Sequence, residues 1–371
     1  MGAGWARGGP NLAGPRPCCG ARSHGRRRQR VAGFSTFLVP ERVKATAADQ
    51  ELGRRMVRAW QQDGIFQVRR DPDLEELTDA AMCAARAFFR LPLGLKHRCV
   101  NDLSYSGYIE SGEELTAGVP DQPEIFTVTP HFDHGHRRVR KGMPCHGPVP
   151  WPGDPFRYAI EAYLCGVGEL GERILRLVAL GLGLGPSGAR QLTGLTRGGW
   201  HHLRALHFPA RTGESERGIG AHTDYGLLVI AAQDEVGGLY VRPPVEGEQR
   251  SRNWVAGESS AGRAEDAQDW RFVEPESGVL TVFPGDILEF LTRGVVEATA
   301  HRVRLAERER YALAYFHEPH FDARMRPLGG RRSEETLHYG RHFTDMFMRC
   351  YPERATTRRI IREDRLAAMA P

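Results

Sequence analysis

The feature that most limits how this chain can fold is a series of short apolar segments between residues 201 and 317. Turn-forming residues separate the segments, for example Gly237-Gly238 and Pro284-Gly285-Asp286, and no helical pattern lies between them. The segments are HHLRALHF, LLVIAAQ, GLYVRP, WRFVEP, VLTVF, DILEFL, HRVRLA and RYALAYF. About eight short strands in succession predict a double-sheet jelly roll or a barrel.

The regions on either side carry helical patterns. Residues 51–62 and 74–90 are predicted helices, and Thr78 or Asp79 is a candidate cap for the second. Residues 156–183 have apolar residues at helical spacing, which predicts one long helix or two short ones. The segment HYGRHFTDMFMRCYP is also helical in pattern, whereas GIFQVRR is typical of a short strand.

These patterns predict an α+β fold built as one structural unit. The core is a jelly roll, or double-stranded β-helix, over residues 196–330. An N-terminal helical region with loops covers residues 34–195, and its stretch from 101 to 150 is expected to form long loops. A C-terminal helical segment over residues 331–371 is expected to pack on the core.

Residues 1–33 differ in composition from the rest of the chain. They contain seven of the 51 basic residues and none of the 46 acidic ones, and they are rich in Gly and Pro. This composition predicts a disordered basic tail. The tail could be a dispensable extension from a misplaced translation start, a contact for polyanions or a targeting segment. Since the remaining chain is nearly balanced in charge, no nucleic-acid partner is expected.

The seven cysteines show no paired spacing, and this predicts free thiols in a reducing, cytoplasmic compartment. No uninterrupted apolar run approaches 18 residues, so we expect no membrane association. The phosphate-binding pattern GxxxxGK[ST] is also missing. We expect a monomer that acts on small molecules.

A candidate metal site lies in the stretch GIGAHTDYGLLVIAAQD, which contains His222 and Asp224. Alternate residues of a strand share one face, so an imidazole and a carboxylate would lie side by side there. Two histidines and one carboxylate are the signature of non-haem Fe(II) oxygenases. His301, at the start of the alternating segment HRVRLA, is the predicted third ligand. We therefore predict that His222, Asp224 and His301 are the catalytic metal ligands.

Arg310 opens the segment that follows His301. A guanidinium near a chelating metal suits a dicarboxylate cosubstrate such as 2-oxoglutarate, because it can bind the far carboxylate through two hydrogen bonds. Two further His-x-Asp triplets, at His131 and His320, lack this context. They are predicted to be surface loops.

Longer stretches of the chain resemble a known family. The motifs are YSGYIESGEELTAG, PDQPEIFTV, PCHGPVPWP, RPPVEGE, RNWVAGESSAG, VFPGDILEF, YFHEP and MFMRCYP, within about residues 50–360. They resemble the 2-oxoglutarate-dependent ethylene/succinate-forming enzymes, a branch of the isopenicillin-N-synthase-like Fe(II)/2-oxoglutarate oxygenases. HTDYG and PGD occur across the wider superfamily, whereas SGEELTAG, RPPVEGE and MFMRCYP are narrower.

The resemblance implies a function. Such enzymes convert 2-oxoglutarate and O2 into ethylene and CO2, and in parallel hydroxylate L-arginine at C5, forming succinate, guanidine and pyrroline-5-carboxylate. Fe(II) is the implied cofactor, 2-oxoglutarate the cosubstrate and ascorbate a reductant for assays. The implied arginine-binding residues are Glu114, Thr116, Arg204, Tyr225 and Arg349. Phe208 and Phe316 are implied to enclose 2-oxoglutarate with Arg310.

One position departs from the wider superfamily. Many relatives have a serine two residues after the anchoring arginine, whereas this chain has Ala312, as the ethylene-forming branch does. Two alternatives remain open at this level. One is a hydroxylase or desaturase of the same superfamily with another small substrate, and the other is a non-catalytic jelly-roll binding module.

Overall fold

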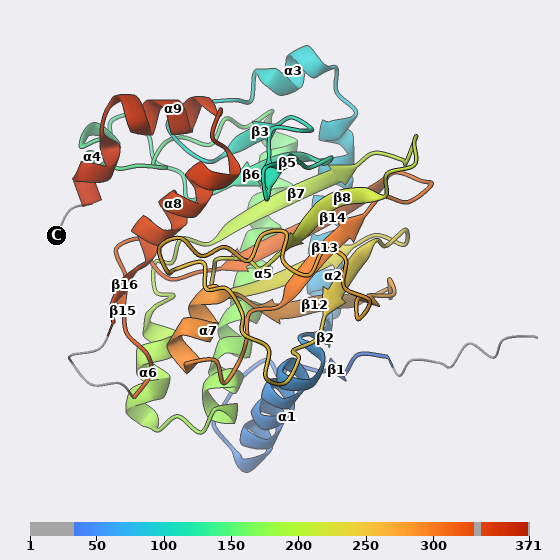
Figure 1. The fold of residues 1–371 in the computed structure, drawn as a ribbon, viewed down its shortest axis with the longest axis vertical. Helices are drawn as coiled ribbons and strands as arrows, with labels where there is room; N and C mark the ends of the chain where they lie inside the picture. Colours follow the sequence, from blue (N-terminus) through green and yellow to red (C-terminus); the bar gives the residue numbers. More distant parts are fainter. Residues whose placement is uncertain (1–32, 330–334, 370–371) are drawn as a thin grey trace, which may run out of the picture. The chain divides into compact units, whose positions relative to one another are not determined.

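Two β-sheets form the centre of the fold in this computed structural model, which describes residues 33–329 and 335–369 (Figure 1). The large sheet has eight strands, in the order β1 (Thr36–Phe37), β2 (Phe66–Arg69), β12 (Val279–Pro284), β9 (Leu228–Gln233), β14 (Arg310–His317), β7 (His202–Phe208), β6 (Glu124–Val128) and β3 (Gly107–Ile109). The small sheet has four, in the order β11 (Arg271–Phe272), β10 (Leu239–Arg242), β13 (Ala300–Arg304) and β8 (Arg217–His222). Within these sheets all neighbouring strands are antiparallel except β1 and β2. The predicted jelly-roll core is confirmed.

Three long helices accompany the large sheet. They are α1 (Ala47–Asp63), α2 (Pro72–Phe89) and α5 (Asp154–Gly181). Helix α5 packs against α1 and α2 and contacts β9 and β14 of the sheet (Figure 1). Residues Phe34–Pro371 belong to one compact unit, and the predicted tail lies almost entirely outside the described residues. Within the described residues, no helix is long and apolar enough to cross a membrane.

The remaining elements are short. Helices α3 (Leu93–His97), α4 (Arg137–Arg140), α6 (Pro186–Gly194) and α7 (Asp286–Thr292) lie in the connections. The C-terminal region contains α8 (Tyr339–Cys350), α9 (Ala355–Arg362) and a 3-10 helix (Arg365–Met369). Two small hairpins complete the described structure, β4 (Leu115–Thr116) with β5 (Val119–Pro120) and β15 (Arg324–Met325) with β16 (Leu337–His338).

Three local predictions were wrong. Helix α2 is capped by Asp71, whose side chain accepts a hydrogen bond from the Leu74 amide, rather than by Thr78 or Asp79. The segment DILEFL is helix α7 rather than a strand, because short buried apolar runs suit either structure. The expected long loop over 101–150 contains β3 and β6, whose pairing extends the large sheet.

His202 of β7 is buried against Phe343 of helix α8. The residue is 1% exposed, and its ring stacks on Phe316, with 4.4 Å between ring centroids. Burial lowers the pKa of His202 to about 3. The ring is therefore neutral in the folded protein at any pH near neutrality.

This burial predicts an acid-sensitive fold. The unfolded chain has a histidine pKa of about 6.5 and takes up a proton below that pH, whereas folded His202 does not. We expect the free energy of unfolding to fall as pH decreases from 6.5 toward 3, by up to about 1.4 kcal/mol per pH unit from this residue. Denaturant unfolding of metal-free wild type and His202→Gln at several pH values measures the contribution. If the free energy of unfolding changed equally with pH in the two proteins, His202 would not be a source of acid sensitivity.

Candidate metal centre and adjoining pockets

Three side chains with metal-binding atoms meet at the ends of β8 and β13. His222 is the last residue of β8 and is the cross-strand partner of His301 in β13. Asp224 lies beyond the end of β8, so the strand alternation that the sequence suggested does not place its carboxylate beside the histidines. The Nε2 atom of His222 lies 3.7 Å from one oxygen of Asp224, and that of His301 lies 3.6 Å from the other. All three predicted ligands are therefore brought together.

Hydrogen bonds orient both imidazole rings. Nδ1 of His222 lies 2.8 Å from the Gly220 carbonyl oxygen, and Nδ1 of His301 lies 3.1 Å from the Thr299 carbonyl oxygen. A carbonyl can only accept, so each Nδ1 carries a hydrogen, and each Nε2 is the ring nitrogen that faces Asp224 and is left to bind a metal. This is the usual arrangement of metal-binding histidines.

The donor set fits a divalent transition metal. Two ligands about 2.1 Å from one ion, at a right angle, are about 3 Å apart, and the three ligand atoms here lie within 4.8 Å of one another. Burial lowers the pKa of His301 to about 4, which keeps its imidazole in the neutral form that binds metals. Two histidines and one carboxylate leave coordination positions for a cosubstrate and O2.

Arg310 is a buried cation that forms no salt bridge within the described residues, and the Asp234 carboxylate acts on it only at longer range. It is 3% exposed, and its Nε and Nη1 atoms have no hydrogen-bond acceptor there. Its guanidinium carbon lies 4.6 Å from the centroid of the Phe208 ring. Burial lowers the pKa of Arg310 to about 10. A buried arginine with free donors suits a carboxylate ligand.

A cavity connects Arg310 with the metal centre. Its walls come from both sheets, and it contains the three predicted metal ligands, Phe208, Phe316 and Ala312. The absence of a hydroxyl at position 312 leaves this part of the wall apolar. The cavity can accept a ligand with one end at Arg310 and the other at the metal centre.

His222 and Asp224 also line a second cavity. All five residues that the resemblance implied for arginine binding line it, namely Glu114, Thr116, Arg204, Tyr225 and Arg349. The two cavities share Arg204, Ile219, His222 and Asp224, so they meet at the candidate metal centre. Arg349 lies at an exposed position, where its guanidinium donates to the Glu258 carbonyl oxygen at 3.3 Å.

Two residues that the sequence did not single out hold the second cavity together. Tyr351 donates its hydroxyl hydrogen to Glu114 at 2.7 Å, and Arg204 donates to the other oxygen of that carboxylate at 2.5 Å. Asp121 accepts hydrogen bonds from the Thr116 hydroxyl at 2.6 Å and from the Gly220 amide at 3.1 Å. Both residues lie inside quoted motifs, but their types and spacing carry no signal of these contacts.

A second cluster of two histidines and a carboxylate exists but is a poor metal site. Glu172, His201 and His317 also bring their ligand atoms within 4.8 Å of one another. The two imidazole rings are stacked with an interplanar angle of 13°, so their in-plane lone pairs cannot converge on one ion. Nδ1 of His201 accepts the Glu318 amide hydrogen at 3.0 Å, which uses its lone pair. Glu172 of α5 lies 3.3 Å from Nε2 of His317 in β14, so the cluster joins this helix to the large sheet.

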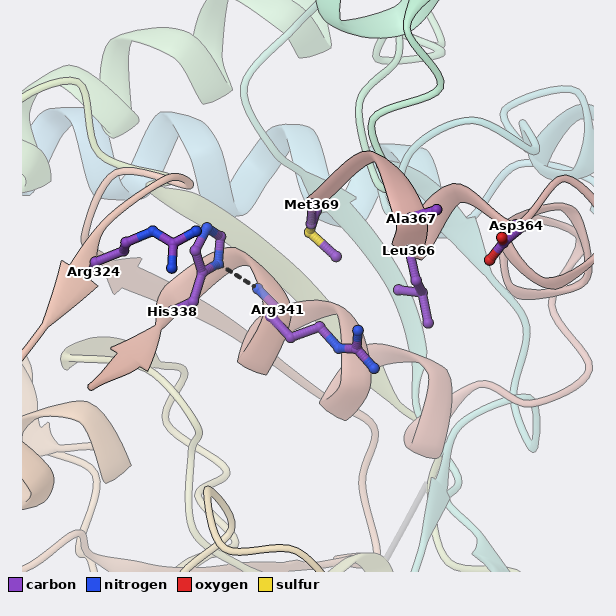
Figure 2. A pocket seen from close by; sticks show the side chains of 7 residues that line it. All are labelled: Arg324, His338, Arg341, Asp364, Leu366, Ala367 and Met369. Carbon is purple, nitrogen blue, oxygen red and sulfur yellow. Dashed lines mark hydrogen bonds between the residues drawn. The ribbon is translucent and has the colours of Figure 1, made fainter. Parts of the chain in front are cut away.

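Other candidate features lie away from this centre. His131 bonds its own neighbour Asp133 on an exposed loop, and Asp322 pairs with Arg138. Another pocket, of about 560 Å³, is larger than the two cavities at the candidate metal centre. Figure 2 shows the side chains that line it, where His338 accepts a hydrogen bond from the Arg341 amide. None of the predicted site residues lines that pocket, so its size does not make it the active site.

Comparison with known proteins agrees with this geometry. Residues 36–154 match the family model described as non-haem dioxygenase in morphine synthesis N-terminal, and residues 199–319 match the 2OG-Fe(II) oxygenase superfamily. The chain is 54% identical to the 2-oxoglutarate-dependent ethylene/succinate-forming enzyme of Ralstonia nicotianae, over 89% of this chain and 96% of that protein. The chain belongs to the 2OG-Fe(II) oxygenase superfamily.

More distant relatives of this oxygenase include homoarginine-6-hydroxylase 2-ODD-233 of Oryza sativa, which is 29% identical over 76% of this chain and 84% of the relative. Among solved structures, a 2OG-Fe(II) oxygenase family protein from Caulobacter crescentus has a TM-score of 0.66 at 22% identity. The match covers 85% of this chain and 98% of the Caulobacter chain. That likeness supports the fold. Family membership makes the oxygenase an iron- and 2-oxoglutarate-dependent enzyme.

Proposed function

We propose that the oxygenase converts 2-oxoglutarate and O2 into ethylene and CO2, and in parallel hydroxylates L-arginine at C5. Succinate, guanidine and pyrroline-5-carboxylate are the products of the second route. The observation that carries this proposal is the buried carboxylate of Glu114 in the cavity that also contains His222 and Asp224. A buried carboxylate suits a guanidinium ligand. The name of the Ralstonia relative supports the ethylene and succinate routes.

The residues have distinct proposed roles. His222, Asp224 and His301 hold Fe(II), and Arg310 binds the far carboxylate of 2-oxoglutarate between Phe208 and Phe316. Iron supplies the activation of O2. The apolar walls around Arg310 exclude water and fix the cosubstrate.

The arginine subsite divides between a guanidinium end and an amino-acid end. Glu114 and Thr116 bind the guanidinium of the substrate. Arg349 is the better partner for its α-carboxylate, because Arg204 already pairs with Glu114. Tyr225 forms the wall between this subsite and the metal centre, since it follows Asp224 directly and lines the same cavity.

A gas assay tests the ethylene route. Purified protein with Fe(II), ascorbate, 2-oxoglutarate and L-arginine should release ethylene, measured by gas chromatography. Succinate formation without ethylene would overturn the ethylene assignment and leave the oxygenase activity intact.

Substitution of Glu114 tests the arginine subsite. Glu114→Gln should raise the KM for L-arginine by about 30-fold, because loss of a buried charge partner costs about 2 kcal/mol or more. The absorption band of the Fe(II)–2-oxoglutarate complex should be unchanged. Glu110→Gln is the matched control, because Glu110 is an exposed neighbour paired with His97. An unchanged KM for Glu114→Gln would contradict the role.

A second candidate is hydroxylation of another small molecule, and the name of the rice relative favours a longer guanidino acid. Succinate release with L-homoarginine, compared with L-arginine at equal concentration, separates the two substrates. Greater turnover with L-homoarginine than with L-arginine would favour this second function over L-arginine hydroxylation.

We also propose a cytoplasmic monomer. The five described cysteines are all free, as expected for a reducing compartment. Light scattering on the purified protein measures its mass in solution.

A further inference from the structure

The connection between β10 and β11, residues 243–270, is bonded to the chain on both sides of His222. Before that histidine, the Gly262 amide donates to the Ala221 carbonyl oxygen at 2.7 Å, and the Ala221 amide donates to Glu265 at 2.5 Å. After it, the Thr223 amide donates to the Ser260 hydroxyl oxygen at 3.2 Å. This connection therefore holds the backbone that carries the first predicted metal ligand.

A closed group of four polar side chains extends this attachment. We call Thr223, Asn253, Ser260 and Asp286 the polar knot. The Asn253 amide nitrogen lies 3.0 Å from the Thr223 hydroxyl, 2.9 Å from the Ser260 hydroxyl and 2.7 Å from an Asp286 carboxylate oxygen. The Thr223 hydroxyl also donates to Asp286 at 2.8 Å. All four residues are at most 9% exposed, so removal of one of these polar side chains would leave its buried partners with fewer hydrogen bonds.

The polar knot continues to the second predicted ligand. The Asp286 amide donates to the Asp224 carbonyl oxygen at 2.8 Å. Gly285 permits this approach, because a Cβ atom there would lie 2.8 Å from the same oxygen. The backbone of Asp224 is thus fixed from the start of α7, and its side-chain direction follows from that backbone.

The same connection forms part of the second cavity, the proposed binding site of arginine, which we call the arginine-side cavity. Asn253, Ser259, Ser260 and Ala261 line it, and the Glu258 carbonyl oxygen accepts a hydrogen bond from Arg349. Three members of the polar knot, Thr223, Asn253 and Ser260, therefore also form part of the wall of the proposed substrate cavity. One segment contacts both the metal turn and the proposed substrate subsite.

We propose that Asn253 is a positioning residue for the metal centre. By joining the connection to Thr223 and Asp286, it sets the direction of the His222 and Asp224 ligand atoms relative to the arginine-side cavity. Asn253 supplies no metal ligand of its own, and it acts on the centre through Thr223. The part of this inference that concerns arginine rests on the proposed function, whereas the part that concerns Fe(II) rests on family membership.

Two variants of Thr223 test whether the polar knot positions the metal ligands. Thr223→Val removes the hydroxyl at constant volume, whereas Thr223→Ser keeps it. In anaerobic titrations followed by the visible band of the Fe(II)–2-oxoglutarate complex, Thr223→Val and Asn253→Ala should raise the Kd for Fe(II) by about 10- to 100-fold. Thr223→Ser should stay within about threefold of wild type. Gln268→Ala is the control, because Gln268 lies in the same connection and bonds only locally to the Asp266 carbonyl oxygen among its described contacts.

A thermal measurement separates positioning from general stability. The titrations are run well below the unfolding temperature of each metal-free variant, so that every protein is folded. Wild-type Fe(II) affinity in Thr223→Val, together with a lowered unfolding temperature, would overturn the positioning role. Should Asn253→Ala fail to fold, the comparison of valine with serine at position 223 still decides.

Turnover measurements test whether Asn253 also positions the metal centre relative to bound arginine. In Asn253→Ala, at saturating Fe(II), the fraction of 2-oxoglutarate consumed without arginine oxidation should rise and kcat should fall, with little change in the KM for 2-oxoglutarate. Unchanged coupling would overturn this half. Absence of arginine-dependent turnover in the wild type would contradict the proposed function instead, and the Fe(II) titrations would still test the positioning role.

Discussion

Asp224→Ala should abolish 2-oxoglutarate turnover, with kcat reduced by about a thousandfold or more, equivalent to about 4 kcal/mol of transition-state stabilisation. The variant should also lose the visible band of the Fe(II)–2-oxoglutarate complex. The reason is geometric, because Asp224 is the carboxylate that lies within 3.7 Å of both His222 and His301. Two histidines alone do not hold Fe(II) tightly. The unfolding temperature of the metal-free protein should change far less than the activity does.

The second histidine–carboxylate cluster supplies the control for this experiment. Glu172→Gln changes a carboxylate beside two histidines in the same protein, at a site whose rings cannot share an ion. It should keep the absorption band and a stoichiometry of one Fe(II) per chain. Loss of the band in Glu172→Gln and its retention in Asp224→Ala would reverse the assignment of the two clusters.

Arg310→Leu should have opposite effects on stability and on catalysis. In the ligand-free protein it removes a buried charge that forms no salt bridge within the described residues, so the unfolding temperature should stay the same or rise. The same change removes the partner of the far carboxylate of 2-oxoglutarate. The KM for 2-oxoglutarate should rise by about 150-fold, which corresponds to about 3 kcal/mol.

Two measurements check Arg310→Leu. Thermal unfolding with and without 2-oxoglutarate should show stabilisation by the ligand in wild type and none in the variant. Arg304→Leu is the control, because Arg304 lies on the neighbouring β13 and pairs with Glu216 at the surface. If Arg310→Leu unfolds at a much lower temperature without ligand, then Arg310 serves the fold rather than the cosubstrate.

The β-core and the candidate metal site could be predicted because they depend on local patterns. Alternating apolar and polar residues in HRVRLA and RYALAYF predict strands with one buried and one exposed face. The His-x-Asp triplet before an apolar segment predicts two metal ligands. Strand β8 was harder to see, because its sequence RGIGAH contains two glycines and little alternation. The family resemblance supplied the arginine-side residues, which spacing alone did not.

Most of the contacts that the sequence could not reveal join distant segments. Tyr351 reaches Glu114 across 237 residues, and Asn253 reaches Asp286 across 33. No periodicity marks such pairs, because each depends on how separate elements pack. The helix α7 was missed for a related reason, since Ile287, Leu288, Phe290 and Leu291 are buried all round and suit a strand equally well.

The pair formed by Glu114 and Arg204 has a consequence for selectivity. In the ligand-free protein the Glu114 carboxylate already pairs with the Arg204 guanidinium, with 2.5 Å between Nη2 and Oε2. Arg204 is a largely buried residue of β7, so we expect a substrate guanidinium to share this carboxylate with Arg204 rather than to replace it. A compact ammonium such as that of lysine cannot form the paired, planar hydrogen bonds of a guanidinium. Binding at Glu114 should therefore favour arginine over lysine, since the two differ in the geometry of their donors and not in charge.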